Sequence, residues 1–197
     1  MKKVFLIFFF LSALLSSTAS NVNDFCIADL KGPDSPTGYH CLPPDRVTAS
    51  DFKYSFEAGN ATSIPFRAEI IPATVREYPA LNGLGISAAR VEIDRGGFFP
   101  MHTHPGGTEL VILLKGEVVA GIVTPTTSYV NTLKAGDLMV FPQGLLHFIV
   151  NSGKEKAIAY AVFSSANPRL NLLFQQLFAN NASSEFIALT TFLDISQ

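Results

Sequence analysis

The sequence predicts an all-β protein built as an antiparallel sandwich or barrel. Between Phe66 and Ser164, short apolar runs recur about every eight to twelve residues, and Gly, Pro, Asn or Lys residues separate them. Many short strands at this spacing favour a closed antiparallel architecture over a β-α-β fold. Hydrophobic residues make up 48% of the 197 residues and charged residues 15%, which excludes a disordered chain and a coiled coil.

The expected strands cover residues 84–93, 109–114, 118–123, 138–141, 147–150 and 157–163. After Pro168 the pattern changes, because Leu170, Leu173, Phe174 and Leu177 follow the spacing of an amphipathic helix. We therefore expect a helix over 168–178 and a shorter one from Ser183 to Leu189. No repeat and no low-complexity linker interrupts residues 21–197, which predicts a single domain.

The first twenty residues have the pattern of a secretory signal peptide. Lys2 and Lys3 precede an apolar run, and small residues at 16–20 offer a cleavage site after Ala19 or Ser20. A membrane anchor is the alternative, but the apolar run is shorter than the roughly 20 residues needed to cross a bilayer. We expect a secreted protein without a membrane span.

Secretion makes the two cysteines and the glycosylation sequons interpretable. Cys26 and Cys41 favour one disulfide in an oxidising compartment, and a zinc site that includes His40 is the weaker alternative. The tripeptides that begin at Asn60 and Asn181 match the N-glycosylation signal. The formal net charge of −2, without a basic cluster, argues against nucleic acid as a partner.

Three of the four histidines fall into a pattern that suits a metal ion. His102 and His104 are two residues apart, so on a strand both rings face the same side. Glu109 begins an apolar run, where a carboxylate is costly to bury unless it is paired or binds a cation. His147 follows a later turn. A single histidine is more often a structural core or surface residue, so the four residues by themselves leave the structural and the metal-binding interpretations open.

Longer motifs around these residues resemble the germin family of the cupin superfamily. Gly96, His102, His104, Glu109 and Gly116 match the spacing of the first cupin motif. Gly136, Pro142, Gly144, His147 and Asn151 match the second. The segments 24–30, 82–85 and 141–148 are similar to germins, the last two to the auxin-binding type of germin-like protein.

This resemblance implies a fold, a ligand set and an assembly. The fold would be a cupin jelly-roll β-barrel with short C-terminal helices, and Cys26 and Cys41 would form the family's disulfide. His102, His104, Glu109 and His147 would bind manganese, which oxygen and imidazole ligands with open positions suit. The resemblance also implies secretion to the plant apoplast or cell wall and assembly into trimers or hexamers.

The activity is harder to predict than the metal. True germins oxidise oxalate with the help of two asparagines, and the alignment places Ala89 and Phe99 at those positions, where neither side chain donates a hydrogen bond. Manganese-dependent superoxide dismutation needs less substrate binding. A non-catalytic protein that binds a ligand such as auxin, or a storage-type wall protein, is a further alternative. The sequence thus predicts a secreted manganese-binding germin-like protein, related to defence and without oxalate oxidase activity.

Overall fold

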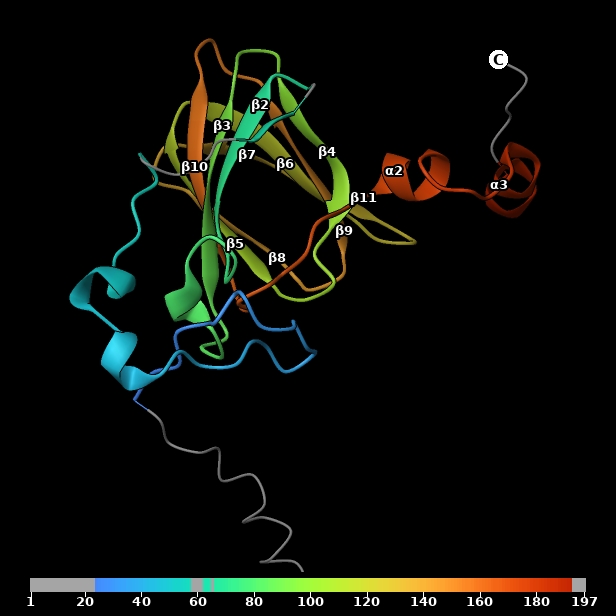
Figure 1. The fold of residues 1–197 in the computed structure, drawn as a ribbon. Helices are drawn as coiled ribbons and strands as arrows, with labels where there is room; N and C mark the ends of the chain where they lie inside the picture. The colour runs from blue at the N-terminus through green and yellow to red at the C-terminus, as the bar shows by residue number, and fades with distance from the viewer. Residues whose placement is uncertain (1–23, 58–61, 65, 193–197) are drawn as a thin grey trace, which may run out of the picture.

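The computed structural model describes residues 24–57, 62–64 and 66–192, so the expected signal peptide (1–20) and Asn60 lie outside the described residues. Two antiparallel sheets face each other around a common core (Figure 1). The strands are β1 (Thr62–Ile64), β2 (Ala68–Ala73), β3 (Ser87–Ile93), β4 (Phe98–Thr103), β5 (Glu109–Lys115), β6 (Glu117–Val123), β7 (Ser128–Lys134), β8 (Leu138–Phe141), β9 (Leu146–Asn151), β10 (Ala157–Phe163) and β11 (Asn171–Leu172). Short helices are η1 (Pro44–Arg46), η2 (Ala49–Phe52), η3 (Pro79–Leu81), α2 (Leu173–Phe178) and α3 (Ser184–Thr191).

The chain passes repeatedly from one sheet to the other. The six-stranded sheet has the order β1-β2-β3-β10-β5-β8, and the five-stranded sheet has the order β11-β4-β9-β6-β7. From β3 to β5 and again from β7 to β11, each successive strand belongs to the opposite sheet. This route is a jelly roll, and it confirms the predicted all-β class.

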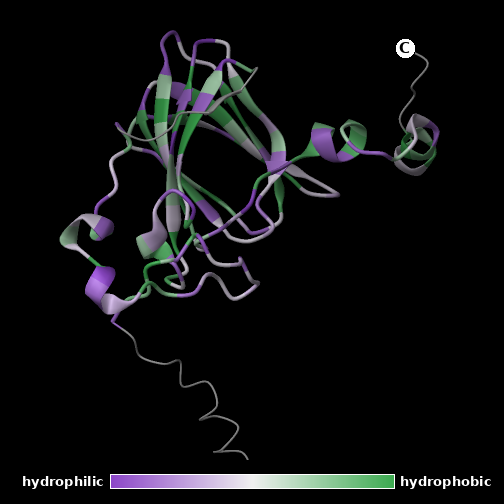
Figure 2. Cartoon of the chain, viewed as in Figure 1, coloured by the Kyte–Doolittle hydropathy of each residue, from purple (hydrophilic) through white to green (hydrophobic). Residues whose placement is uncertain are grey.

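Alternating burial explains why the two sheets close on each other. In β10 the odd-numbered residues from Ala157 to Phe163 are buried, and the residues between them lie closer to solvent. Figure 2 shows hydrophobic and hydrophilic residues alternating along the strands. Removing one face of most of the strands from water provides the main driving force for this packing.

Most of the predicted strands lie where the sequence placed them. Residues 138–141 and 157–163 have the predicted bounds, and the other four predicted strands differ by one to three residues at an end. The six expected strands leave out β1, β2, β4, β7 and β11. In β7, six of the seven residues are exposed at the edge of the sheet. A strand without a buried face lacks the apolar alternation on which the prediction depended.

The predicted helix over 168–178 begins too early. Helix α2 starts at Leu173, because Asn171 and Leu172 pair with Thr103 and His102 to form β11. Arg169 has a positive φ of 57°, which a helix does not allow. The second predicted helix corresponds to α3, whose first turn is capped by the Ser183 hydroxyl. Among the described residues, no helix is long and apolar enough to span a bilayer.

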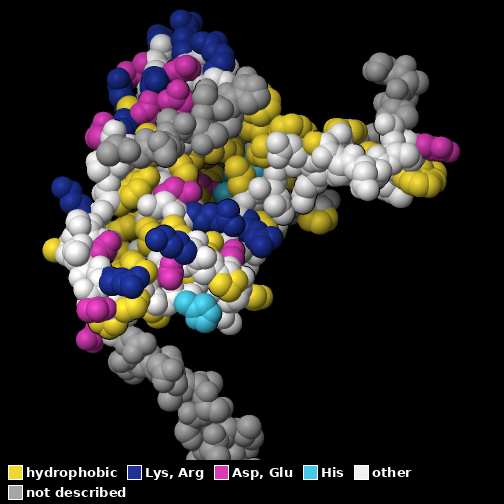
Figure 3. Space-filling model, in the orientation of Figure 1, with side chains coloured by type: hydrophobic (Ala, Val, Ile, Leu, Met, Phe, Trp, Pro, Cys, Tyr) yellow, Lys and Arg dark blue, Asp and Glu magenta, His cyan; other side chains and the backbone are white. Residues whose placement is uncertain are grey.

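The C-terminal helices extend from the barrel as an arm (Figure 1). Phe174 of α2 contacts Phe66, with ring centroids 5.6 Å apart, and Phe66 packs on Phe98. Further out, Phe178, Phe186 and other apolar side chains are exposed, and Figure 3 shows hydrophobic side chains along this arm. Exposed apolar surface of this kind is typical of a segment that packs against another molecule.

The N-terminal segment is held to the barrel by a disulfide and a buried amide. Cys26 and Cys41 form the disulfide. Asn82 follows η3, and its side-chain amide donates to the Tyr39 carbonyl at 2.8 Å and accepts from the Tyr39 amide at 3.1 Å. The same amide group lies 3.1 Å from the Cys26 sulfur. The Asn82 side chain therefore binds both the disulfide and the loop that the disulfide closes.

We expect Asn82→Ala to lower the free energy of unfolding by about 1–3 kcal/mol, since it leaves partly buried backbone groups of Tyr39 without partners. Urea denaturation of the disulfide-bonded protein measures the change. Asn131→Ala, at an exposed position of β7, is the matched control. Equal denaturation midpoints for the two variants would show that the Asn82 amide does not fasten this loop.

Candidate metal centre

The four residues that the sequence singled out come together inside the barrel. His102 lies on β4, His104 directly follows that strand, Glu109 begins β5 and His147 lies on β9. His102 and His147 are direct partners across the β4–β9 pair. All four residues are buried, and one potential ligand atom from each lies within 4.8 Å of the others. Strands from both sheets thus supply one compact set of donors.

Backbone carbonyls fix the orientation of all three imidazoles. The Nδ1 atom of His102 lies 2.7 Å from the Pro100 carbonyl, and that of His147 lies 2.8 Å from the Leu145 carbonyl. The Nδ1 atom of His104 bonds to the Arg169 carbonyl. A carbonyl only accepts, so each Nδ1 must donate its hydrogen. In the neutral rings, Nε2 therefore carries a lone pair, which is the form that binds metals.

The arrangement around Glu109 requires a positive charge. Its Oε2 lies 3.0 Å from His147 Nε2 and 3.2 Å from His104 Nε2. Two nitrogen lone pairs facing a carboxylate oxygen repel it unless protons or a metal ion lie between them. Burial raises the pKa of Glu109, but hydrogen bonds from His104 and His147 outweigh it and lower the pKa to about 2. The donor set therefore fits a cation held by three imidazoles and one carboxylate.

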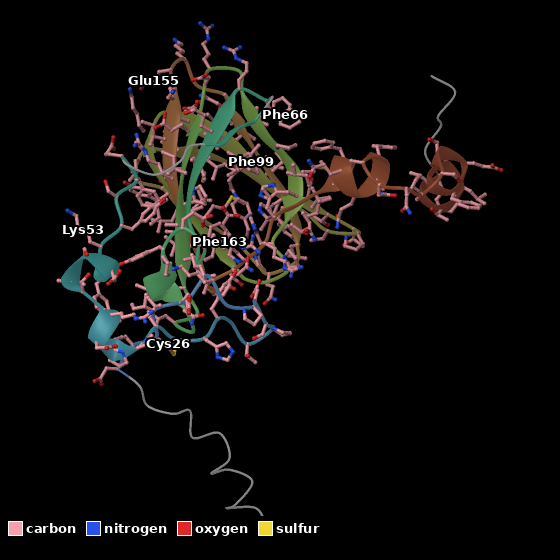
Figure 4. All side chains as sticks on the ribbon, in the orientation of Figure 1. Cys26, Lys53, Phe66, Phe99, Glu155 and Phe163 are labelled. Carbon is pink, nitrogen blue, oxygen red and sulfur yellow. A yellow bond between two sulfur atoms is a disulfide. The ribbon has the colours of Figure 1, made fainter. Side chains whose placement is uncertain are left out.

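Each imidazole also packs against a phenylalanine ring. Phe99 lies 4.7 Å from His102 between ring centroids, and Phe163 lies 4.8 Å from His104. Phe141 stacks on His147 at 4.4 Å. Figure 4 shows Phe99 and Phe163 inside the barrel. These rings exclude water from the sides of the site and restrict ring rotation, which preorganises the donors.

A cavity of about 310 Å³ adjoins the donors. His102, His104 and Glu109 line it, whereas His147 does not. Ala89 and Phe99 line it as well, so these two side chains face the same space as the candidate ligands. A transition metal held here would supply Lewis acidity and, where redox-active, one-electron chemistry.

Burial of His102 predicts a stability that depends on pH. Burial and the neighbouring His147 lower the pKa of His102 from 6.5 to about 3. Between these values the unfolded chain binds more protons than the folded chain, so the stability of metal-free protein falls as the pH decreases. We expect a loss of up to about 2 kcal/mol between pH 6.5 and 4.5 from this group. Urea denaturation of chelator-treated protein measures it, and His102→Gln should reduce the pH dependence; an unchanged slope would contradict the assignment.

Comparisons with known proteins now define the family. A sequence profile described as cupin matches residues 54–197. Auxin-binding protein ABP19a of Prunus persica is 50% identical over 98% of this chain and 94% of its own length. Germin-like protein subfamily 3 member 3 of Arabidopsis thaliana is 45% identical over 98% of this chain and 92% of its own. The chain belongs to the germin-like proteins of the cupin family.

Solved structures agree with this membership. An oxalate oxidase superposes on the germin-like chain with a TM-score of 0.82 and 31% identity, covering 89% of this chain and 91% of that one. Peruvianin-I, described as a cysteine peptidase from Thevetia peruviana latex, gives a TM-score of 0.73 and 34% identity over 78% of this chain and 96% of its own. The resemblance inferred from the two histidine motifs is therefore confirmed.

The other residues considered in this germin-like chain lie outside the group of four candidate ligands. Asn181 is exposed between α2 and α3, as a glycosylated asparagine must be. Asn151 lies away from the histidine contacts and holds a turn, donating to the Ile93 and Glu155 carbonyls at 2.8 Å each. The sequence did not indicate Arg169, whose carbonyl orients His104 from 65 positions further along the chain. No local motif marks a backbone acceptor, so nothing in the sequence could have indicated it.

Proposed function

We propose that this chain is a secreted manganese-binding germin-like protein of the plant apoplast or cell wall, with a defence-related role and without oxalate oxidase activity. The observation that carries the proposal is the convergence of His102, His104, Glu109 and His147 with every Nδ1 committed to a carbonyl. The proposal includes a signal peptide at 1–20, one domain over 21–197 and glycans on Asn60 and Asn181.

The chemistry of the donors supports manganese. One carboxylate oxygen and three imidazoles leave two positions open on an octahedral ion, and thiolate ligands are absent from the set. Mn(II) accepts oxygen and nitrogen ligands, although copper and zinc bind most such sites more tightly when offered equally. The metal ions available during secretion then decide which ion occupies the site.

The cavity argues against oxalate as a substrate. Ala89 and Phe99 offer no hydrogen-bond donor, and both side chains are buried against the space that the substrate would enter. A dianion placed there would lose its hydration without gaining equivalent hydrogen bonds. The manganese-loaded protein should therefore produce hydrogen peroxide from oxalate no faster than metal-loaded serum albumin does in the same peroxidase-coupled assay.

Superoxide dismutation is the second candidate. It needs a redox metal that a small anion can reach, and three of the four donors line the cavity. Loss of dismutation in His102→Ala, at equal protein concentration, would favour this enzyme over a non-catalytic protein that binds a ligand such as auxin or serves storage. Cysteine peptidase chemistry is excluded, because the chain has two cysteines and they form the disulfide.

Secretion and assembly are supported by separate features. The disulfide is typical of proteins that pass through an oxidising compartment. The apolar arm formed by α2 and α3 supports a trimer or hexamer of this chain. A fluorescent fusion of the full sequence should accumulate outside plasmolysed plant cells, and deletion of residues 1–20 should retain it inside. Retention of the full-length fusion would contradict secretion.

A further inference from the structure

His104 is held less firmly by its own strand than the other two candidate histidine ligands are. His102 lies within β4 and His147 within β9, and the two residues are direct partners across this strand pair. The Nδ1 atom of each bonds to a carbonyl only two positions before it along the chain. Strand β4 ends at Thr103, so His104 lies just beyond the ladder. The orientation of His104 is therefore fixed from outside β4 and β9.

The carbonyl that orients His104 belongs to a remote segment, residues 167–172, which we call the strap. The Nδ1 atom of His104 bonds to the Arg169 carbonyl, 65 positions further along the chain. The strap follows β10, includes β11 and leads into helix α2. One candidate ligand thus depends for its orientation on a part of the chain that supplies none of the four donors.

The strap is fastened to the barrel on both sides of this contact. Before Arg169, the Pro168 carbonyl accepts a hydrogen bond from the Gly106 backbone amide at 3.0 Å. After Arg169, Leu172 pairs with His102 in the ladder between β11 and β4. The side chains of Pro168 and Leu172 are buried. Release of the strap from the barrel would break these contacts and free the His104 imidazole at the same time.

The backbone of Arg169 is strained. Its φ is 57°, in the left-handed region, which costs free energy for any residue other than glycine. Arg67 has a similar φ of 60°, but its carbonyl accepts from the Asp94 backbone amide at 2.9 Å. Strained backbone persists where surrounding contacts enforce it, and it is typical of functional sites. At Arg169 the left-handed conformation is the one that aims the carbonyl at a candidate metal ligand.

From these observations we propose that Arg169 is a positioning residue of the metal centre, so that docking of the strap and binding of the metal stabilise each other. With the strap docked, His104 Nε2 is held 3.2 Å from the Glu109 carboxylate. With the strap released, the His104 ring rotates, and only two imidazoles and the carboxylate stay oriented. The inference rests on the proposed metal site and adds to it a way in which metal retention is regulated.

Substitution by proline tests the role of the left-handed backbone. Proline fixes φ near −65°, so Arg169→Pro cannot keep the conformation that aims the carbonyl. Within the described part of the chain, the Arg169 backbone N–H donates to no protein acceptor, so the substitution removes no hydrogen bond of its own. Calorimetric titration of metal-free, disulfide-bonded protein with Mn(II) should show at least about tenfold weaker binding, as is typical when a group that orients a ligand is lost.

Two further variants separate positioning from a general loss of stability. Arg67→Pro removes the other left-handed arginine, whose carbonyl bonds to Asp94, and it should bind manganese as the parent does. Arg169→Gly keeps the left-handed conformation accessible and should bind manganese within about threefold of the parent. An unfolding midpoint shows whether each variant has folded. If Arg169→Pro binds manganese as tightly as Arg67→Pro does, or if Arg169→Gly binds as weakly as Arg169→Pro, the inference is wrong.

Hydrogen exchange on the parent protein tests the reciprocal effect and decides the question even if Arg169→Pro does not fold. Manganese loading should slow exchange of the strap amides by about tenfold, because the metal must stabilise the docked strap by the factor by which docking raises metal affinity. The turn at residues 94–97, which bonds to Arg67, is the comparison and should change less. Equal changes in the two segments would overturn the inference.

Metal analysis of the same samples distinguishes the two possible failures. If the parent holds manganese but the variants or the exchange rates contradict the expectation, the role of Arg169 is wrong and the metal site stands. If the parent holds no metal after loading, the proposed function fails, and the inference about the strap fails with it.

Discussion

We expect Glu109→Gln to weaken Mn(II) binding by about 100-fold or more, because Glu109, which is 5% exposed, is the only anionic donor among the four candidate ligands. Three neutral imidazoles and an amide favour Cu(II) or Zn(II), so the variant should retain these ions better than manganese. Competition between equal concentrations of Mn(II) and Zn(II), followed by metal analysis of the desalted protein, measures the change in preference.

Glu69→Gln is the matched control for this substitution, since Glu69 is exposed on β2 and belongs to the opposite face of the strand from the core. It should bind manganese as the parent does. If Glu109→Gln also binds manganese as well as the parent does, the carboxylate is not a ligand and the assigned donor set is incorrect.

We expect His147→Ala to lower both metal affinity and stability. His147 is 1% exposed and stacks on Phe141, so the substitution leaves a cavity and should lower the free energy of unfolding by about 2–4 kcal/mol. Loss of the donor from β9 leaves two imidazoles and a carboxylate, so all metals should bind more weakly, by about 10-fold to 100-fold for manganese. The preference among metals should change less than in Glu109→Gln, because the anionic donor remains.

His40→Ala provides the comparison for His147→Ala, because His40 is exposed beside the disulfide. Urea denaturation and calorimetric titration with Mn(II) on the two variants and the parent give both quantities. Should His147→Ala bind manganese with the affinity of His40→Ala, the strand β9 would have no part in the site.

The candidate ligands could be predicted because their signal is local. On a strand, alternate side chains face the same side, so the spacing of His102 and His104 predicts two rings on one side. Glu109 stands out because a carboxylate begins an apolar strand. The position of His147 came from the spacing of its motif, since no property of a single residue states that β9 lies beside β4. Cross-strand pairing is a long-range property, and here only the resemblance to a family motif predicted that His147 joins the other ligands.

The supports of the site could not be predicted in the same way. The Arg169 carbonyl bonds to His104 next to the pairing of β11 with β4, and this pairing also keeps the residues before Leu173 out of the predicted helix. The apolar residues after Pro168 follow helical spacing, but the pairing of Asn171 and Leu172 with β4 overrode this local preference. The cavity likewise depends on the alanines of β10 facing inward together, which only the closed barrel determines.

Metal content of the protein purified from its native cell wall, without refolding and without added metal, tests the proposed manganese site most directly. Atomic spectrometry of such protein should find about one equivalent of manganese per chain, held by His102, His104, Glu109 and His147. Less than about a tenth of an equivalent of any transition metal would contradict the site.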